Sequence, residues 1–349
     1  MTDLDQRIAS VLRERAEGEI DTHRLLRASR AQGRRRQLRR RAVTGGALAL
    51  VGVLGFMGVA GTELPGLPGR LPWTAATPTV APAVPPRVDG VAGAAQRPDL
   101  VGTDPAVLHL GVDTTKASYL GWAVKGFGVE TVRIEVGGGQ PVTVDVARTV
   151  EVFDGLGIEG FPIDAVPTRR AFDGTVRQVR GTTGGLIMSW QPAAGVYARA
   201  AMLGGDRAAL ARAVDALRWD EARRCGTPLR LGTLPTDATV GGCSVDVSAF
   251  PGTINAELTL YRGRSATMYV RLQYAAQMVG VRADGNRTVG SRPAYLYPDG
   301  GKLELLGIPK VHLVADFGWP AQGFTEADAA TALAGARVAD DLTRPESWD

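Results

Sequence analysis

The chain has 349 residues, of which 44% are hydrophobic, so it is long enough for two domains and apolar enough to form packed cores. This composition excludes a chain that is disordered throughout. The net charge of +4 is unevenly distributed, because the first 41 residues carry 12 arginines and 6 acidic residues and the remainder is mildly acidic. A mildly acidic region offers no basic face to a phosphate backbone, so we exclude nucleic acid as its partner.

Residues 1–41 predict a basic helical segment in the cytoplasm. Leu4, Ile8, Val11 and Leu12 follow the spacing of one helical stripe. The segment ends in a cluster of arginines, which is typical of residues retained on the cytoplasmic side of a membrane. Such a cluster also favours contact with the head groups of anionic lipids. We predict a membrane-orienting role for Arg34, Arg35, Arg36, Arg39, Arg40 and Arg41.

Residues 42–61 contain no charged side chain and predict a transmembrane helix. A helix of roughly 20 residues rises about 30 Å, which matches the hydrocarbon core of a bilayer. The alternative is a cleaved export signal, because residues 58–60 form a weak cleavage site. With the arginines inside, we expect a protein of the plasma membrane whose N-terminus is cytoplasmic and whose C-terminal region is extracytoplasmic.

The stretch 62–105 predicts a Pro-rich linker. It contains nine prolines, which remove backbone donors and interrupt any regular element. A chain of this composition is partly extended and carries the region that follows it away from the membrane surface.

From residue 106 onward the pattern changes to the alternation typical of β-strands. Residues 131–136 and 142–146 are apolar at every second position and are joined by a glycine-rich turn, which predicts a hairpin. Asp206 and Thr325 are predicted to cap two helices. Further strands are predicted at 176–180, 186–190, 196–202, 256–261, 267–272, 295–297 and 311–315.

The two halves of this region resemble each other in order and spacing. Residues 108–124 align without a gap on residues 229–245, and each half ends in one of the predicted helices. We therefore predict an α+β ectodomain that is a tandem duplication of a mostly antiparallel β-sheet unit, each unit ending in one helix. The predicted divisions of the chain are 1–41, 42–61, 62–105, a first repeat at 106–224 and a second repeat at 225–349.

Cys225 and Cys243 are the only cysteines, and both follow the predicted membrane span. A disulfide is favoured there because thiols outside the reducing cytosol oxidise. The alternatives are two free buried thiols or a metal pair, and the absence of a nearby histidine argues against the metal.

The sequence contains no recognisable catalytic or cofactor signature. The stretch 155–160 matches G-x-G-x-x-G, but Pro162 and Pro167 follow it where a dinucleotide fold needs a helix, so we predict a turn. His109 and His312 lie in the polar phase of alternating strands, which predicts residues on the surface of a sheet. The carboxylates are scattered and form no acid/base pair. We predict no catalytic residue, no cofactor and no metal site.

The whole layout resembles the uncharacterised single-pass membrane proteins of actinobacteria. The likeness lies in the basic leader ending in RRRQLRRRA, the glycine-rich span, the Pro-rich tether and the duplicated region. Some of these proteins are similar to partners of extracytoplasmic-function sigma factors, and no functional residue transfers with the resemblance.

Three functions are open at this point. The first is a membrane-anchored extracytoplasmic binding or sensor protein, without catalytic activity, that binds an envelope ligand or protein. The second is a transmembrane regulator whose residues 1–41 bind a sigma-factor-like or other cytoplasmic protein. The third is an envelope hydrolase.

Overall fold

The computed structural model describes residues 81–154, 156–158, 161, 172–179, 182, 184–278, 282–318 and 323–348. They belong to one compact unit, Ala76–Asp349. The predicted leader, the predicted span and the six membrane-orienting arginines lie outside the described residues. In the part that is described, no helix is both long enough and apolar enough to cross a membrane.

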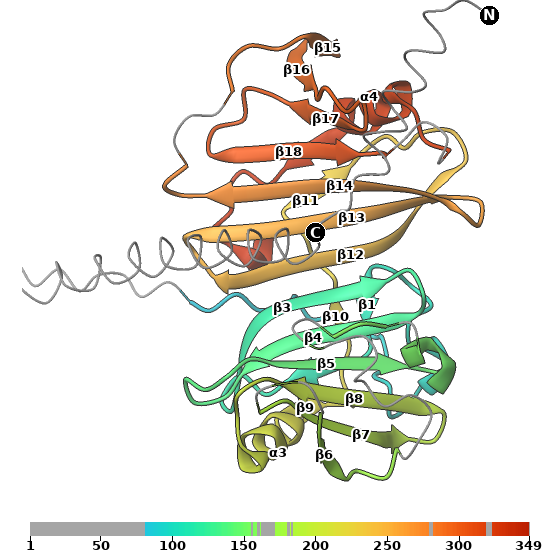
Figure 1. Cartoon of the computed structure of the whole chain (residues 1–349), viewed down its shortest axis with the longest axis vertical. Helices are drawn as coiled ribbons and strands as arrows, with labels where there is room; N and C mark the ends of the chain where they lie inside the picture. The colour runs from blue at the N-terminus through green and yellow to red at the C-terminus, as the bar shows by residue number, and fades with distance from the viewer. Residues whose placement is uncertain are drawn as a thin grey trace, which may run out of the picture. The chain divides into compact units, whose positions relative to one another are not determined.

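Within the described residues, thirteen strands form one antiparallel sheet (Figure 1), in the order β15-β16-β17-β18-β14-β13-β12-β3-β4-β5-β8-β7-β6. The first half of the chain contributes β3 (Ser118–Lys125), β4 (Val129–Glu135), β5 (Val142–Ala147), β6 (Val176–Gln178), β7 (Leu186–Ala193) and β8 (Val196–Met202). The second half contributes β12 (Ala238–Ala249), β13 (Thr253–Arg262), β14 (Ala266–Ala275), β15 (Arg287–Val289), β16 (Arg292–Leu296), β17 (Lys302–Leu305) and β18 (Val311–Asp316).

The strands β3 and β12 join the two halves into this single sheet. Ala123 lies directly opposite Ser244, and Trp122 lies opposite Val245. The predicted α+β class with a separate sheet unit in each half is therefore wrong, because the described chain is mostly β and its strands share one sheet. The physical reason is that pairing satisfies the backbone groups that β3 and β12 would each leave free at the edge of a separate sheet.

Two short helices and three small ribbons complete the described elements. The helices are α3 (Arg207–Asp215) and α4 (Glu326–Ala334), and they begin at the predicted caps Asp206 and Thr325. Three short 3-10 turns are η1 (Pro98–Leu100), η2 (Val150–Asp154) and η4 (Pro345–Ser347). The ribbons pair β1 (Val107–Leu108) with β10 (Arg223–Arg224), β2 (Gly111–Val112) with β9 (Leu217–Arg218), and β11 (Leu229–Leu231) with β19 (Ala336–Val338).

Part of the predicted linker packs against the sheet unit. Ala83, Ala94 and Val101 are buried in its core, and Arg87 forms a bridge with Arg223 of β10. The chain is thus already part of the compact unit before the first predicted repeat begins.

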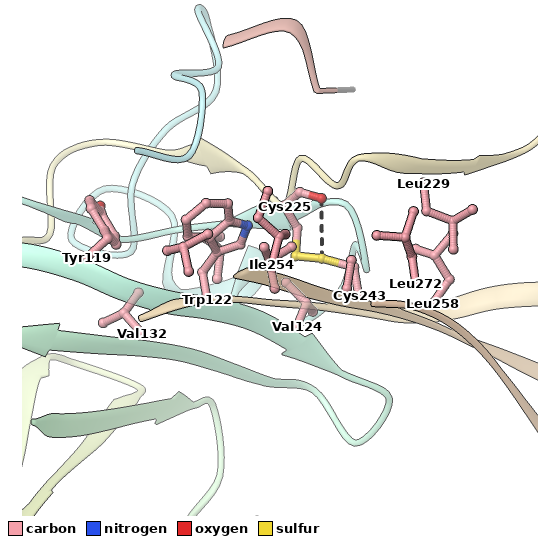
Figure 2. Packing of buried hydrophobic residues seen from close by; sticks show 14 of the residues in the cluster. Tyr119, Trp122, Val124, Val132, Cys225, Leu229, Cys243, Ile254, Leu258 and Leu272 are labelled. Carbon is pink, nitrogen blue, oxygen red and sulfur yellow. Dashed lines mark hydrogen bonds between the residues drawn. A yellow bond between two sulfur atoms is a disulfide. The ribbon is translucent and has the colours of Figure 1, made fainter. Parts of the chain in front are cut away.

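One face of the sheet packs against both helices, and we call it the helix face. Trp122 lies at its centre (Figure 2), where its ring contacts Tyr119 and Trp348 at centroid distances of 6.0 and 6.3 Å. Its indole N–H donates to the carbonyl of Gly226 at 3.2 Å. Strand register aligns a row of apolar residues on this face: Ala200, Val144, Val132, Trp122, Val245, Ala256, Leu272, Leu313 and Leu305.

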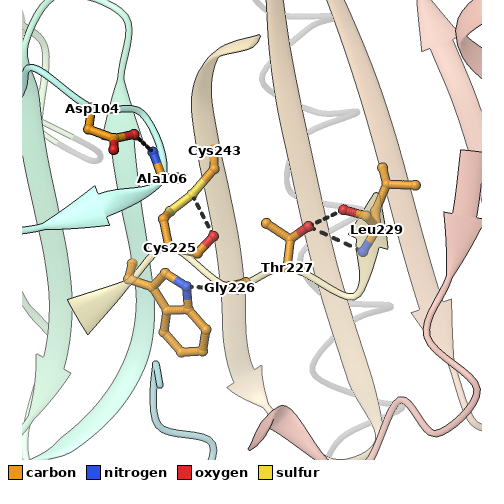
Figure 3. Close-up of a disulfide and its surroundings, with 8 residues drawn as sticks. Asp104, Ala106, Cys225, Gly226, Thr227, Leu229 and Cys243 are labelled. Carbon is orange, nitrogen blue, oxygen red and sulfur yellow. Dashed lines mark hydrogen bonds between the residues drawn. A yellow bond between two sulfur atoms is a disulfide. The ribbon is translucent and has the colours of Figure 1, made fainter. Parts of the chain in front are cut away.

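The predicted disulfide between Cys225 and Cys243 is confirmed (Figure 3). It joins the segment between β10 and β11 to the central strand β12, with a Cα–Cα distance of 6.3 Å. Both cysteines are buried, so the bond lies inside the core that the two halves share.

Candidate functional site

The face of the sheet opposite the two helices, which we call the open face, is covered in the first half by the chain itself. The rings of Phe153 and Phe172 pack at a tilt with centroids 5.5 Å apart, and the Phe172 ring centroid lies 5.2 Å from that of Tyr197 of β8. Nearby, Ile158 packs against Ile187 of β7. This part of the open face is therefore already occupied by polypeptide.

In the second half the described residues leave a groove over the same face. It spans β12, β13, β14, β17 and β18 and has a volume of about 590 Å³. Because successive side chains of a strand point to opposite faces, the residues between the buried apolar positions line this groove. They are mostly polar, and they include Asn255, Glu257, Arg271, Gln273, His312 and Asp316.

Arg271 is the centre of a charged network in the groove. Its Nε donates to Glu257 at 2.6 Å, and one Nη donates to Asp316 at 2.9 Å. The Lys302 ammonium lies 3.6 Å from the same Asp316 carboxylate. Burial opposes the charge of Arg271, yet the contacts with Glu257 and Asp316 hold its pKa above the usual value. The network fixes the guanidinium across three adjacent strands.

Glu304 is the centre of a second polar cluster beside the groove. This carboxylate is buried, and its two oxygens accept hydrogen bonds from His312 Nδ1 at 2.7 Å and the Tyr297 hydroxyl at 2.8 Å. Burial and the hydrogen bond to Glu304 raise the pKa of Tyr297. The phenol therefore stays protonated over the physiological range and acts as a donor.

The open face of the second half is also rich in tyrosine. Four of the seven tyrosines of the chain lie on it, namely Tyr261, Tyr269, Tyr295 and Tyr297. Arg271 lies over the Tyr269 ring at 4.8 Å, and Arg282 lies over the Tyr295 ring at 3.6 Å. Tyrosine and arginine are the residues that most often carry binding energy at protein interfaces.

The groove continues toward the first half along the central strands. A second hollow of about 290 Å³ shares Ser244 and Asp246 with it. Here Arg133 of β4 donates to Asp246 of β12 at 3.0 Å, which links the two halves across β3. The hollow ends at Ile158, where the chain begins to cover the sheet.

The prediction that both histidines lie on the surface of a sheet has a different outcome for each. His312 lies on the sheet face and is half-buried, whereas the prediction is wrong for His109. His109 lies between β1 and β2 and is 2% exposed, and its Nδ1 is 2.7 Å from Glu130 Oε1. Glu130 also accepts backbone N–H groups of Gly102 and His109. A buried carboxylate with three donors is satisfied within the fold, so this pair is a structural element.

Sequence reasoning missed the residues of the groove as a group. The alternating strand at 267–272 indicates that Tyr269 and Arg271 share a face, but nothing in it indicates that the face is left open. Over the described ranges, no three histidine, cysteine, aspartate or glutamate side chains are grouped so that they could hold a metal ion.

Comparison of the sequence with protein-family models and with curated proteins finds no match. Among solved structures, the chain is similar to "Crystal structure of MucB in complex with MucA(peri)". The identity is 12% and the TM-score is 0.21, and the similarity covers 66% of this chain and 92% of that chain.

Proposed function

We propose that the protein is a membrane-anchored extracytoplasmic binding protein whose open face, in the second half of the sheet, receives a segment of another protein. The observation that carries the proposal is the contrast between the two halves of one sheet face. The first half is covered by its own chain around Phe153 and Phe172, and the second half presents a groove over equivalent strands.

The chemistry of the groove favours a polypeptide partner. Several of its charged residues are already paired, as Arg271 is with Glu257 and Asp316. Such pairs can form hydrogen bonds with a partner at a lower cost of desolvation than isolated charges. The tyrosines add large, rigid contact areas. The extracytoplasmic location is supported by the disulfide and by the predicted span at residues 42–61.

The test is site-specific photocrosslinking in the full-length protein in its own membrane. A photoreactive residue replaces Gln273, which is exposed at the groove, and in a control it replaces Phe127, which is exposed at a turn of the first half. We expect one discrete protein adduct from position 273 and none from position 127.

Matched substitutions separate specific contact from chance encounter. Arg271→Gln should reduce the adduct at position 273 at least severalfold, whereas Arg264→Gln, in the exposed turn between β13 and β14, should leave it unchanged. The unfolding midpoints of both variants are compared with that of the wild type. Absence of an adduct, or an adduct that survives both Arg271→Gln and Tyr297→Ala in folded protein, would contradict the proposal.

A further inference from the structure

One edge of the groove on the open face contains a pair that can bind a proton, formed by His312 of β18 and Glu304 of β17. His312 lines the groove with a side chain that is 35% exposed, whereas the Glu304 side chain is 2% exposed. Nδ1 of His312 lies 2.7 Å from Oε1 of Glu304. An ionised carboxylate only accepts hydrogen bonds, so Nδ1 carries a proton. Nε2, on the other side of the ring, is therefore the atom that gains or loses one.

Glu304 has no permanent cation beside it in the part of the chain that the structure describes. Its second oxygen accepts from the Tyr297 hydroxyl at 2.8 Å, and the raised pKa of this phenol keeps it neutral. The ion-pair contact of Glu304 is with the imidazole, whereas the nearby Lys302 ammonium contacts Asp316. The buried carboxylate is thus without a counter-charge while His312 is neutral, and protonation of His312 brings the net charge of the pair to zero.

The other charged side chains around His312 belong to types whose ordinary titration lies outside the range of about pH 5 to 8. They come from each element packed around it, namely Arg271 of β14, Glu257 of β13, Lys302 of β17, Asp316 of β18, Asp299 of the turn before β17, and Arg282, which lies over the Tyr295 ring. Directly opposite His312, on β14, is the uncharged Gln273. Among the described residues of the groove, His312 is therefore the group that responds to pH in this range.

The second pair of this kind, His109 with Glu130, lacks access to a partner. His109 is 2% exposed, and Glu130 accepts two backbone N–H groups in addition to the imidazole. That pair is closed off inside the fold. The pair in the groove differs because the imidazole lies where the proposed partner would cover it.

We infer that protonation of His312 regulates the groove, so that the polypeptide partner binds more tightly in acid than at neutral pH. The inference rests on the proposed function of the groove. A partner that lies in the groove removes water from His312 and its carboxylate. Loss of water penalises a pair with a net charge more than a pair whose charges cancel. The protonated pair is therefore covered at lower cost, and by linkage the binding of the proton and of the partner strengthen each other.

Photocrosslinking of the full-length protein in its own membrane, repeated at different external pH values, tests this inference. The photoreactive residue replaces Asn255, which is exposed in the groove, so that Gln273 opposite His312 is retained. We expect the yield of the protein adduct to rise about fivefold or more from about pH 8 to about pH 5, a typical size for the coupling between two binding events.

Two substitutions separate the charge of the pair from its hydrogen bond. His312→Gln retains a donor but cannot be protonated, so the adduct yield should no longer change with pH. Glu304→Gln removes the negative charge, so covering the groove now penalises the charged imidazole and the yield should be higher at about pH 8 than at about pH 5. His23→Gln, which removes a histidine of the leader, is the matched control and should respond to pH as the wild type does. Unfolding midpoints of all variants are compared at both pH values.

The outcomes distinguish this inference from the proposed function. An adduct whose yield is equal at both pH values would overturn the inference and leave the proposed function in place. The inference is equally wrong if folded His312→Gln or Glu304→Gln keeps the pH response of the wild type. Absence of an adduct at every pH would contradict the proposed function and this inference with it.

Discussion

Arg262 of β13 forms a bidentate ion pair with Asp328 of α4, in which its two Nη atoms donate to the two carboxylate oxygens at 3.2 and 2.6 Å. The residues are 66 positions apart in the sequence, and the guanidinium also lies over the Phe324 ring at 4.5 Å. Asp328 at the same time accepts the backbone N–H and the hydroxyl of Thr325, which completes the capping box of α4. One carboxylate thus both begins the helix and holds it to the sheet.

Replacing this guanidinium should destabilise the fold even when the charge is kept. We expect Arg262→Lys to lower the free energy of unfolding by about 1–3 kcal/mol. An ammonium group cannot form the bidentate pair of hydrogen bonds that the guanidinium makes with the carboxylate. Denaturant unfolding followed by circular dichroism measures the change. Arg264→Lys, two residues away in the exposed turn, is the control and should have no effect.

Asp328 should also make the stability depend on pH in the acid range. The hydrogen bonds from Arg262, and those from Thr325, hold the pKa of Asp328 below its usual value in spite of its partial burial. Because the pKa is lower in the folded state than the unfolded value of about 3.9, the carboxylate stabilises the fold above about pH 4. This stabilisation is lost as the pH falls through the folded-state pKa.

Asp328→Asn isolates this effect from the other carboxylates. The variant should be less stable than the wild type at neutral pH, and the difference should shrink as the pH is lowered below about 4. The measurement is the free energy of unfolding of both proteins across that range. A difference in the free energy of unfolding that stays constant with pH would show that Asp328 does not stabilise the fold through its charge.

The disulfide should contribute substantially to stability. Its two cysteines are separated by 18 residues, and closing a loop of this length stabilises the fold by about 3 kcal/mol in the chain-entropy description. We expect the double substitution Cys225→Ala and Cys243→Ala to lower the free energy of unfolding by about that amount. A reductant should destabilise the wild type and leave the double variant unchanged, and equal sensitivity of the two proteins would contradict this explanation.

The buried pair of His109 and Glu130 should be needed for the fold of the first half. Glu130→Ala removes the acceptor of three hydrogen bonds and leaves buried donors unpaired, so we expect a loss of about 3 kcal/mol or more. The matched control is Glu135→Ala at the half-buried end of the same strand, which should change little. Denaturant unfolding of the two variants measures the contrast, and equal losses would refute the role given to the pair.

Local patterns predicted several elements well. The alternation at 131–136 and 142–146 corresponds to the hairpin of β4 and β5, and the predicted caps Asp206 and Thr325 begin α3 and α4. These features depend on neighbours a few positions apart in the chain. Short-range signals of that kind are visible without a structure.

The central strands escaped the same reasoning. In β3 the residues from Tyr119 to Val124 are all buried. The strand therefore lacks the alternation of apolar and polar side chains by which a strand is predicted from sequence. In β12 the pattern is interrupted by Gly241 and Gly242, and its pairing with β13 shifts at that point. The two strands that join the halves were therefore the least visible in the sequence, and the prediction of separate sheet units followed from missing them.

The candidate groove shows the same limit at the level of function. Alternation places Tyr269 and Arg271 on one face of β14, which the sequence predicts. The partners of Arg271 come from β13 and β18, and the coverage of the first half comes from a segment between β5 and β7. The sequence of one strand contains no information about which residues on other strands pair with Arg271, or about which segments cover the sheet.

By itself, therefore, the sequence determined several of the strands outside the centre of the sheet, the two helix caps and the cysteine pair, because each depends on side-chain spacing along the chain. Only the tertiary structure decided that both halves share one sheet, that His109 is buried against Glu130, and that the described residues cover one half of a sheet face and leave a groove over the other. Those outcomes depend on which strand edges pair and which side chains come into contact across large sequence separations. These long-range contacts are selected by the packing of the whole core and by the need to pair buried polar groups.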